Sequence, residues 1–218
     1  MIAVIDYGMG NIHSLLKAIS LFTDQFVFTD SVSEAEKCDT WILPGDGHFF
    51  KAMENLEKQN FLKALEKHTL ENKKLLGICI GFQILFEDSD EVPKGKGAIS
   101  KGLGFLKGNI RKFQPLPNQK VPHMGWNKIT LPRKNSSVLL KDFRHDPYFY
   151  FIHSYRPTQT ELQFSPGICR YLGEGFPAIV EKGSIFGTQF HPEKSSKSGL
   201  KVLENFLKHA GYVSHSSN

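Results

Sequence analysis

Hydrophobic residues recur with two different periods along the first half of the chain. Short apolar runs predict buried strands at residues 2–5, 26–28, 40–43 and 75–78. Longer segments, with apolar residues three or four positions apart, predict helices at residues 12–22, 49–56 and 61–70. Because strands and helices alternate, this half of the chain predicts a parallel sheet with helices packed against it.

The second half has a different pattern, in which short strand-like runs are broken by proline, glycine and asparagine. The clearest runs are residues 105–106, 110–113, 148–153 and 185–190. They predict an antiparallel extension of the sheet. Residues 87–101 are polar and predict a surface loop, and a last amphipathic helix is predicted from about residue 197 to residue 209.

The two patterns together predict the fold class and the domain organisation. We expect a single α/β domain over residues 1–212, in which a mixed, mostly parallel central sheet is flanked by helices and carries the antiparallel extension. Residues 213–218 are expected to form a C-terminal tail. At 218 residues and 40% hydrophobic composition, the chain is long enough to bury one substantial core.

Composition also narrows the cellular setting. The chain has no apolar run of membrane-spanning length, and its first residues lack the basic start and long apolar middle of a signal peptide. Its three cysteines are an odd number without metal-ligand spacing, which supports neither a disulfide framework nor a zinc site. We therefore expect a cytoplasmic protein that binds no metal and no membrane.

The net charge of +5 and the pI near 9.0 raise the question of nucleic-acid binding. The basic residues are scattered and lack the interleaved aromatic residues of a base-stacking platform, so a solvated or partner-facing surface is favoured and nucleic acid is the alternative. Cofactor motifs are missing as well. His13 stands where a dinucleotide fingerprint that begins at Gly8 needs its third glycine, and no P-loop motif is present. We expect no cofactor.

Candidate chemistry begins at Cys79, which lies between Gly77 and Gly81 where the strand pattern gives way to a helical one. This is the layout of a nucleophile elbow, in which glycines allow a tight strand-to-helix turn that exposes the middle side chain. The N-terminus of a following helix favours the thiolate. A small apolar cysteine that fills a gap in the core is the alternative.

A cysteine nucleophile needs a base and a third group that orients the base. His191 and Glu193 supply such a pair around Pro192, directly after a predicted strand. In extended backbone their side chains lie on one side, so we expect the carboxylate to hold one imidazole nitrogen while the other nitrogen faces Cys79. Taken alone, the segment also fits an ordinary strand end with a surface glutamate.

Acyl transfer requires hydrogen-bond donors for the developing oxyanion. The turn Gly45-Asp46-Gly47 follows a predicted strand and can present a backbone N–H, and the amide of Ile80 would be the second donor by elbow geometry. A plain turn is the alternative, since Pro-Gly turns are common. Because glycines flank the turn, we hypothesise that flipping one of its peptides gives an activated state.

These motifs together resemble the class I, triad-type glutamine amidotransferase family, on residues 77–83 and 189–193. The resemblance implies that Cys79 attacks the side-chain amide of glutamine, that a glutamyl thioester forms, and that ammonia is released. His191 and Glu193 match the other two members of the triad. The mixed sheet wrapped by helices that is typical of the family agrees with the predicted fold.

The same resemblance assigns the substrate site. Gln83 and the backbone of Ser154 and Tyr155 match positions that are associated with L-glutamine binding in the family. These residues lie far apart in the sequence. The resemblance therefore implies that the fold brings them together beside the nucleophile.

Further segments narrow the resemblance to one branch of the family. These segments are residues 6–11, 121–127, 149–155 and 187–195. They are similar to the glutaminase subunits of imidazole glycerol phosphate synthase, and the likeness covers almost the whole chain. In that branch the glutaminase forms a heterodimer with a (β/α)₈-barrel cyclase subunit, which receives the ammonia in histidine biosynthesis. The resemblance implies that Gly10, Asn11, Trp126 and Asn127 face the cyclase.

Asp46 departs from the family pattern, which usually has a small apolar residue in this turn. A carboxylate beside a thiolate or an oxyanion would oppose the negative charge. We therefore predict that the Asp46 side chain points away from Cys79 or is paired with a cation or with backbone donors. An unpaired carboxylate within about 4 Å of the sulfur would contradict this prediction.

Other functions share parts of this pattern. A paralogous glutaminase could supply ammonia to a different synthase, and a cysteine peptidase or another hydrolase could use the same scaffold. A catalytically silent regulatory module is a further alternative, which the intact set of Cys79, His191 and Glu193 disfavours.

Overall fold

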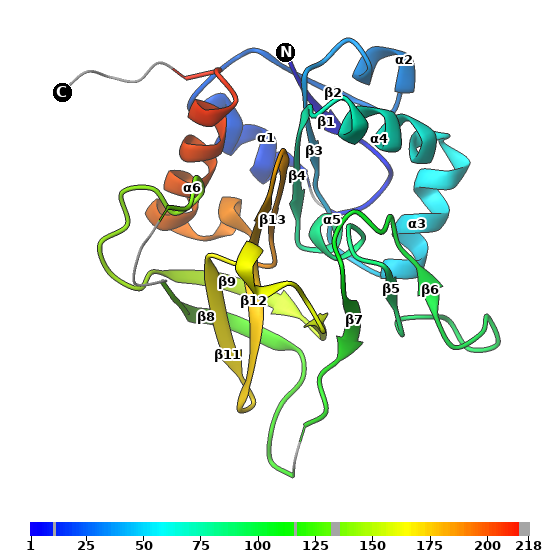
Figure 1. Cartoon of the computed structure of the whole chain (residues 1–218), viewed down its shortest axis with the longest axis vertical. Coiled ribbons are helices and arrows are strands. Elements are labelled where there is room, and N and C mark those ends of the chain that lie inside the picture. Colours follow the sequence, from blue (N-terminus) through cyan, green and yellow to red (C-terminus); the bar gives the residue numbers. More distant parts are fainter. Residues whose placement is uncertain (11, 116, 132–135, 214–218) are drawn as a thin grey trace.

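A nine-stranded mixed sheet runs through the centre of the molecule (Figure 1). The computed structural model describes residues 1–10, 12–115, 117–131 and 136–213. The strands of this sheet are β1 (Ile2–Ile5), β2 (Phe26–Thr29), β3 (Thr40–Leu43), β4 (Lys74–Ile78), β8 (His123–Thr130), β9 (Tyr148–His153), β11 (Gly167–Tyr171), β12 (Glu174–Lys182) and β13 (Ile185–Thr188). Their order is β2-β1-β3-β4-β13-β12-β11-β8-β9.

The two halves of the sheet differ in strand direction. From β2 to β13 all neighbouring strands are parallel, and from β13 to β9 all are antiparallel. The predicted fold class, a mostly parallel sheet with an antiparallel extension, is confirmed. The inner parallel strands β1, β3 and β4 are buried on both faces, as is typical of a sheet covered by helices.

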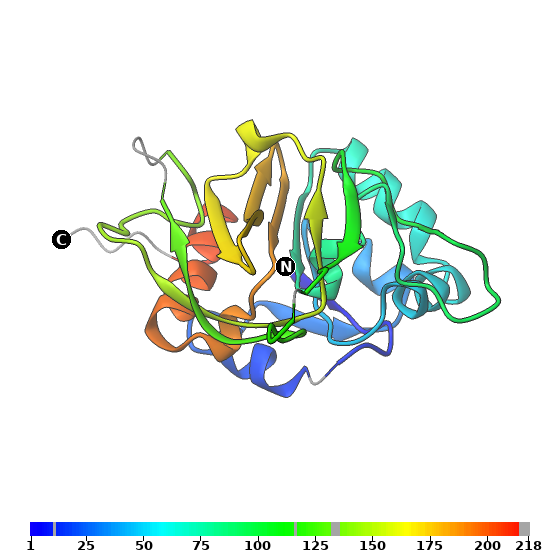
Figure 2. The same ribbon diagram turned by 90° about the horizontal axis from the view of Figure 1, so that it is seen from below.

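Helices cover both faces of the parallel half. They are α1 (His13–Ser20), α2 (Val32–Ala35), α3 (Phe49–Lys58), α4 (Phe61–Leu70), α5 (Ile80–Gln83) and α6 (Ser196–His209). Helices α1 and α6 share a core with Ile2 and Val4 of β1, whereas α3 and α4 share the other core with Ala3 and Ile5. Because successive strand residues face opposite sides, one four-residue strand serves both cores. Figure 2 shows the red α6 and the cyan-green α3 and α4 on opposite sides of the sheet.

A second, smaller sheet lies beside the first, and the sequence patterns did not predict it. It consists of β10 (Tyr155–Thr158), β7 (Asn109–Lys112), β5 (Asp88–Ser89) and β6 (Ser100–Lys101), in that order. The expected surface loop at residues 87–101 therefore has a short strand at each end. Residues 105–106, expected in a strand, lie outside any strand, although Leu106 is buried against Leu85 and its neighbours.

The end of the chain follows the predicted pattern. The last helix was expected at about residues 197–209 and is observed as α6, and Gly211 ends it with a positive φ of 85°. Residues 214–218 of the expected tail lie outside the described residues, and the boundaries of the domain stay a prediction. No helix in the described ranges is long and apolar enough to cross a membrane.

Candidate active site

Cys79 sits at the sharp turn between β4 and α5. Its backbone has φ +53° and ψ −104°, a region that residues with a side chain rarely adopt. The flanking glycines permit this turn. A Cβ on Gly77 would lie 2.5 Å from the carbonyl oxygen of Gly81, and a Cβ on Gly81 would lie 1.9 Å from that of Leu43. The chain therefore has the backbone shape of a nucleophile elbow, although α5 is a single four-residue turn.

His191 reaches the site from the segment that follows β13. Its Nδ1 lies 2.7 Å from Oε1 of Glu193, and the two side chains are 2% and 5% exposed. The expected extended backbone stops at His191, because Pro192 begins the 3₁₀ turn η2 (Pro192–Lys194). A turn, and not the alternation of a strand, brings the carboxylate onto the imidazole.

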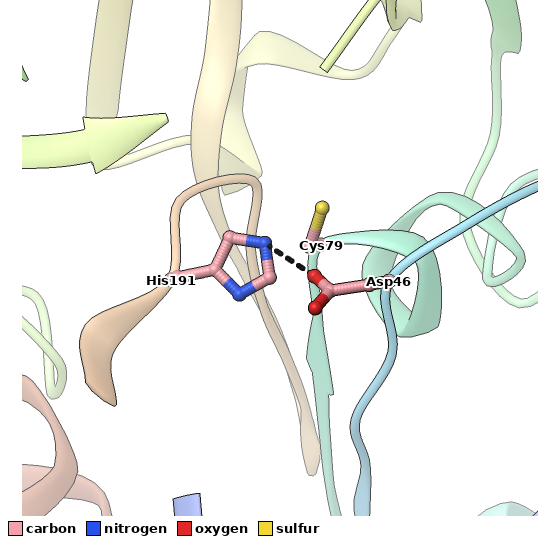
Figure 3. Close-up of side chains that lie close together, drawn as sticks. All are labelled: Asp46, Cys79 and His191. Carbon is pink, nitrogen blue, oxygen red and sulfur yellow. Dashed lines mark ion pairs between the residues drawn. The ribbon is translucent and has the colours of Figure 1, made fainter. Parts of the chain in front are cut away.

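The Asp46 carboxylate contacts the other ring nitrogen of His191, Nε2 (Figure 3). Its Oδ1 lies 3.0 Å from Nε2 of His191, and its Oδ2 lies 3.3 Å from Nζ of Lys194. The contact with Nε2 is an ion pair and lacks the alignment of a hydrogen bond. The predicted pairing of Asp46 with a cation is confirmed. However, one of the two cations is His191 itself, so the carboxylate lies at the nitrogen that was expected to face Cys79.

The electrostatics of the site follow from these contacts. The contact with His191 lowers the pKa of Asp46 to about 2, although burial acts in the opposite direction. Burial alone would lower the pKa of His191. The nearby Cys79, Asp46 and Glu193 outweigh burial and raise the pKa of His191 far above its ordinary value. The two carboxylates at its nitrogens therefore favour the protonated form of His191.

The Cys79 sulfur has other close partners. Its Sγ lies 3.9 Å from the carbonyl oxygen of Ile152 and 3.9 Å from Nε2 of Gln189. The sulfur, Nε2 of His191 and an oxygen of Asp46 all lie within 4.8 Å of one another. Side chains of these types can also bind a metal, but ion pairing accounts for their convergence. The expectation that the site needs no metal stays a prediction.

The turn after β3 is held in a defined orientation. The Tyr7 hydroxyl donates a hydrogen bond to the carbonyl of Pro44, and the amide of Ile80 donates a 3.4 Å hydrogen bond to the carbonyl of Gly45. Gly47 has a φ of +126°, which favours glycine. The Ile80 amide, expected to bind an oxyanion, is therefore engaged by the turn itself, and an oxyanion hole is not open. The roles of the turn and of Ile80 as oxyanion donors stay predictions.

A cavity of about 390 Å³ opens beside Cys79, and Gln83, Ser154 and Tyr155 are among the residues that line it. Gln83 is buried at its rim, where Nε2 donates 3.0 Å hydrogen bonds to the carbonyl of Tyr155 and to Oε1 of Gln189. The fold thus brings the substrate-binding residues expected from the sequence to the sulfur. Their role in binding stays a prediction.

Three residues of the site were missed by sequence reasoning: Gln189, Lys194 and Glu91. Gln189 contacts both Cys79 and Gln83, and its position two residues before His191 in extended backbone was a usable signal. Lys194 pairs with Asp46 across 148 positions of sequence, and Glu91 lines the cavity from a polar loop. The sequence offers no local signal for either of these placements.

The residues expected to face a partner are placed in different ways. Gly10 packs on the turn, where a Cβ would lie 2.6 Å from the amide nitrogen of Asp46. Trp126 is 53% exposed on β8. Asn127 instead turns inward and donates to Nε2 of His123 at 3.1 Å and to the carbonyl of Arg170 at 3.0 Å. Asn11 lies outside the described residues. A partner-facing role stays a prediction for all of them.

Comparisons with known proteins agree with this geometry. Residues 3–210 match the family described as Glutamine amidotransferase class-I. The imidazole glycerol phosphate synthase subunit HisH of Methanocaldococcus jannaschii is 43% identical over 210 residues, which cover 95% of this chain and 99% of that protein. The HisH subunit of Halalkalibacterium halodurans is 40% identical over 210 residues, which cover 94% of each chain.

A solved structure described as a glutamine amidotransferase has a similar fold. It superposes with a TM-score of 0.70 at 16% sequence identity and covers 96% of this chain and 98% of its own. At this low identity the likeness concerns the fold, whereas the sequence matches extend over nearly the whole chain. This chain belongs to the class I glutamine amidotransferase family.

Proposed function

We propose that this chain is the glutaminase subunit of an imidazole glycerol phosphate synthase. It hydrolyses L-glutamine to glutamate and ammonia and delivers the ammonia to a (β/α)₈-barrel cyclase subunit in histidine biosynthesis. One observation carries the proposal: Cys79 stands on a nucleophile elbow beside the His191–Glu193 pair, at the wall of a cavity of about 390 Å³. The names and the high coverage of the HisH relatives support the choice of synthase.

The proposed reaction has two halves. In the first, the Cys79 thiolate attacks the carboxamide carbon of glutamine, and His191 gives a proton to the nitrogen that leaves as ammonia. In the second, a water molecule attacks the thioester while His191 takes up its proton, and glutamate leaves as the thiolate is restored. Glu193 keeps the imidazole oriented through Nδ1 in both halves.

The lining of the cavity suits an amino-acid substrate. The Glu91 carboxylate faces the cavity and can pair with an α-ammonium group, although its Oε2 also accepts a 2.7 Å hydrogen bond from the amide of Phe49. Burial raises the pKa of Glu91, and a substrate ammonium would stabilise its charged form. Gln83 and the backbone of Tyr155 add amide and carbonyl groups at the same wall.

A docking partner is supported by the exposed face of β8 and β9. Met124, Trp126 and Tyr148 are 59%, 53% and 56% exposed there. A second cavity of about 900 Å³ shares Met124 with the first and extends along this side of the molecule. A partner on this face would also protect ammonia, which free in neutral water is mostly protonated and therefore not nucleophilic.

We infer that the chain works in the cytoplasm as a heterodimer and binds neither nucleic acid nor membrane. Its three cysteines are free and buried, and a reactive thiol needs reducing surroundings. Its basic residues form ion pairs with acids on many parts of the surface, such as Lys67 with Glu36. A continuous basic track for a nucleic-acid backbone is not supported by such pairing.

The proposal is tested with Cys79→Ala. This variant should release no glutamate from glutamine, because it lacks the attacking sulfur, but it should bind the cyclase as tightly as the unchanged chain. Cys169→Ala is the matched control, since this buried cysteine lies in β11 and should leave turnover unchanged. Substantial glutamate release by Cys79→Ala would refute the assignment of the nucleophile.

A further inference from the structure

We propose that Asp46 is a positioning residue that restrains glutamine hydrolysis in the partner-free chain, by engaging Nε2 of His191 in an ion pair beside Cys79. This inference rests on the proposed glutaminase function and adds a regulatory role to one side chain of the site. The restraint ends when the Asp46 carboxylate is withdrawn from His191.

The first argument is the geometry at Nε2. The Asp46 Oδ1 atom lies 3.0 Å from this nitrogen, and an oxygen of Asp46 lies within 4.8 Å of the Cys79 sulfur, so the carboxylate competes with the sulfur for the imidazole; the sulfur also contacts the Ile152 carbonyl and Gln189. A base that serves a thiol must offer Nε2 to the sulfur, and an acid that serves the leaving nitrogen must point its proton into the cavity. The contact with Asp46 interferes with both tasks.

The second argument is the anchoring of the carboxylate. Lys194 holds the other oxygen of Asp46 at 3.3 Å, so the Asp46 side chain bridges two cations that belong to the same turn after β13. The carboxylate therefore cannot leave His191 by rotating a short distance without also losing Lys194.

The third argument links the base to the oxyanion turn. Asp46 follows Gly45, whose carbonyl accepts the hydrogen bond of the Ile80 amide. The tether from Asp46 to His191 and Lys194 therefore holds the turn in the orientation that closes the expected oxyanion site. The Asp46 side chain thus restrains both His191 and the turn Gly45-Asp46-Gly47.

The charges around His191 make the restraint effective. The groups that face it are Cys79 at the elbow, Asp46 from the turn after β3, Glu193 from its own turn, and His153 from the end of β9. Burial lowers the pKa of His153 to about 3, so this ring is neutral and does not compete for the carboxylates. An imidazolium held by two carboxylates gives up its proton poorly, so His191 is a weak acid for the nitrogen that leaves as ammonia.

The test neutralises Asp46 without changing its shape. Asp46→Asn should raise the kcat of glutamate release by the partner-free chain roughly tenfold, the change expected for about one pKa unit at the base. KM should change little. Asp39→Asn is the matched control, because Asp39 precedes the amino end of β3 while Asp46 follows its carboxyl end. Asp46→Ala is the second variant in case the amide introduces a new contact.

A direct readout accompanies the kinetics. The titration of the His191 ring is followed by NMR, with the signal assigned by its loss in His191→Gln. In the unchanged chain the ring should stay protonated through neutral pH. In Asp46→Asn its midpoint should move to lower pH, and the acid limb of the partner-free rate profile should move in the same direction.

The outcomes separate the inference from the proposed function. If no form of the chain hydrolyses glutamine even with the cyclase, the proposed function is wrong. Independently of activity, an unchanged midpoint of the His191 titration in Asp46→Asn would overturn the role proposed for Asp46. If glutamine is hydrolysed but both Asp46 variants are as slow as Asp39→Asn without partner, the restraint does not exist. Faster turnover in both variants with a lowered midpoint supports it.

Discussion

At the scale of single residues, the site depends on the two carboxylates that contact the His191 ring. Glu193 binds its Nδ1 from the next turn of the same segment, and Asp46 reaches its Nε2 from a turn nearly 150 positions earlier. Both contacts are ion pairs, and both raise the pKa of His191. We propose that the first orients the ring for catalysis and that the second restrains it.

The role of Glu193 is tested with Glu193→Gln in the complex with the cyclase. The amide keeps the size of the side chain but cannot stabilise the imidazolium, so kcat should fall roughly a hundredfold or more. Glutamate release is measured beside circular dichroism, which should be unchanged. Glu66→Gln on the exposed face of α4 is the control and should lose no activity. Undiminished turnover by Glu193→Gln would show that His191 is oriented by another group.

The sequence predicted the triad because its signals are local. Glycines around Cys79 indicate a turn, and His191 and Glu193 are two positions apart. The meeting of Asp46 with His191 and Lys194 depends on the alignment of β3 and β13 across the sheet, which no local pattern encodes. Spacing also suggested extended backbone at Glu193, whereas Pro192 begins a 3₁₀ turn.

At the scale of elements, the site lies where neighbouring parallel strands end together. Strands β3, β4 and β13 are adjacent in the sheet, and they lead respectively into the Asp46 turn, the Cys79 elbow and the His191 segment. Because carboxyl ends of parallel strands meet at one edge, residues far apart in sequence converge there. Helix α5 approaches β3 closely at Gly81, and this contact helps to hold the Cys79 turn in place.

The close approach is tested with Gly81→Ala. The added Cβ would lie 1.9 Å from the carbonyl oxygen of Leu43, so backbone must move, and the free energy of unfolding should fall by about 3 kcal/mol. Urea denaturation measures the loss. Gly175→Ala is the control, because its Cβ would meet only side-chain atoms at ordinary distances of 3.5 Å or more, and stability should change by less than about 0.5 kcal/mol. Equal stability of the two variants would contradict the tight packing.

Physical features of β12 and β8 explain why the sequence patterns did not predict these two strands. Strand β12 contains Pro177, which argues against a central strand, yet its pairing with β11 is irregular there: Ile168 pairs with Pro177 and Gly167 with Ile179, which leaves Ala178 as an extra residue on β12. Strand β8 is half exposed, and its pattern lacks a continuous apolar run. The parallel strands β1, β3 and β4, in contrast, are almost continuously apolar, which explains why the patterns predicted them so closely.

At the scale of the whole molecule, the chain has an exposed apolar face beside the cavity. Trp126 and Met124 project from β8 and are both more than half exposed, whereas the alternate residues His123 and Asn127 turn inward. Alternation along one strand thus separates an exposed apolar face from a buried polar pair. We propose that the cyclase covers this exposed face.

The docking face is tested with Trp126→Ala. Removing a large aromatic side chain from an interface should weaken the cyclase complex at least tenfold, as expected for loss of about 1.4 kcal/mol or more. Titration calorimetry measures the dissociation constant. Leu70→Ala at the end of α4 is the control, because Leu70 is 82% exposed but lies away from β8 (Figure 1). Unchanged affinity in Trp126→Ala would place the cyclase elsewhere.

We propose that this chain makes ammonia from glutamine for a barrel cyclase. The decisive experiment compares glutamate production by the chain alone, with the cyclase, and with the cyclase and its nucleotide substrate. We expect slow release by the chain alone and strong stimulation when both the cyclase and its substrate are present. Rapid glutamate release that neither the cyclase nor its substrate changes would contradict this proposal.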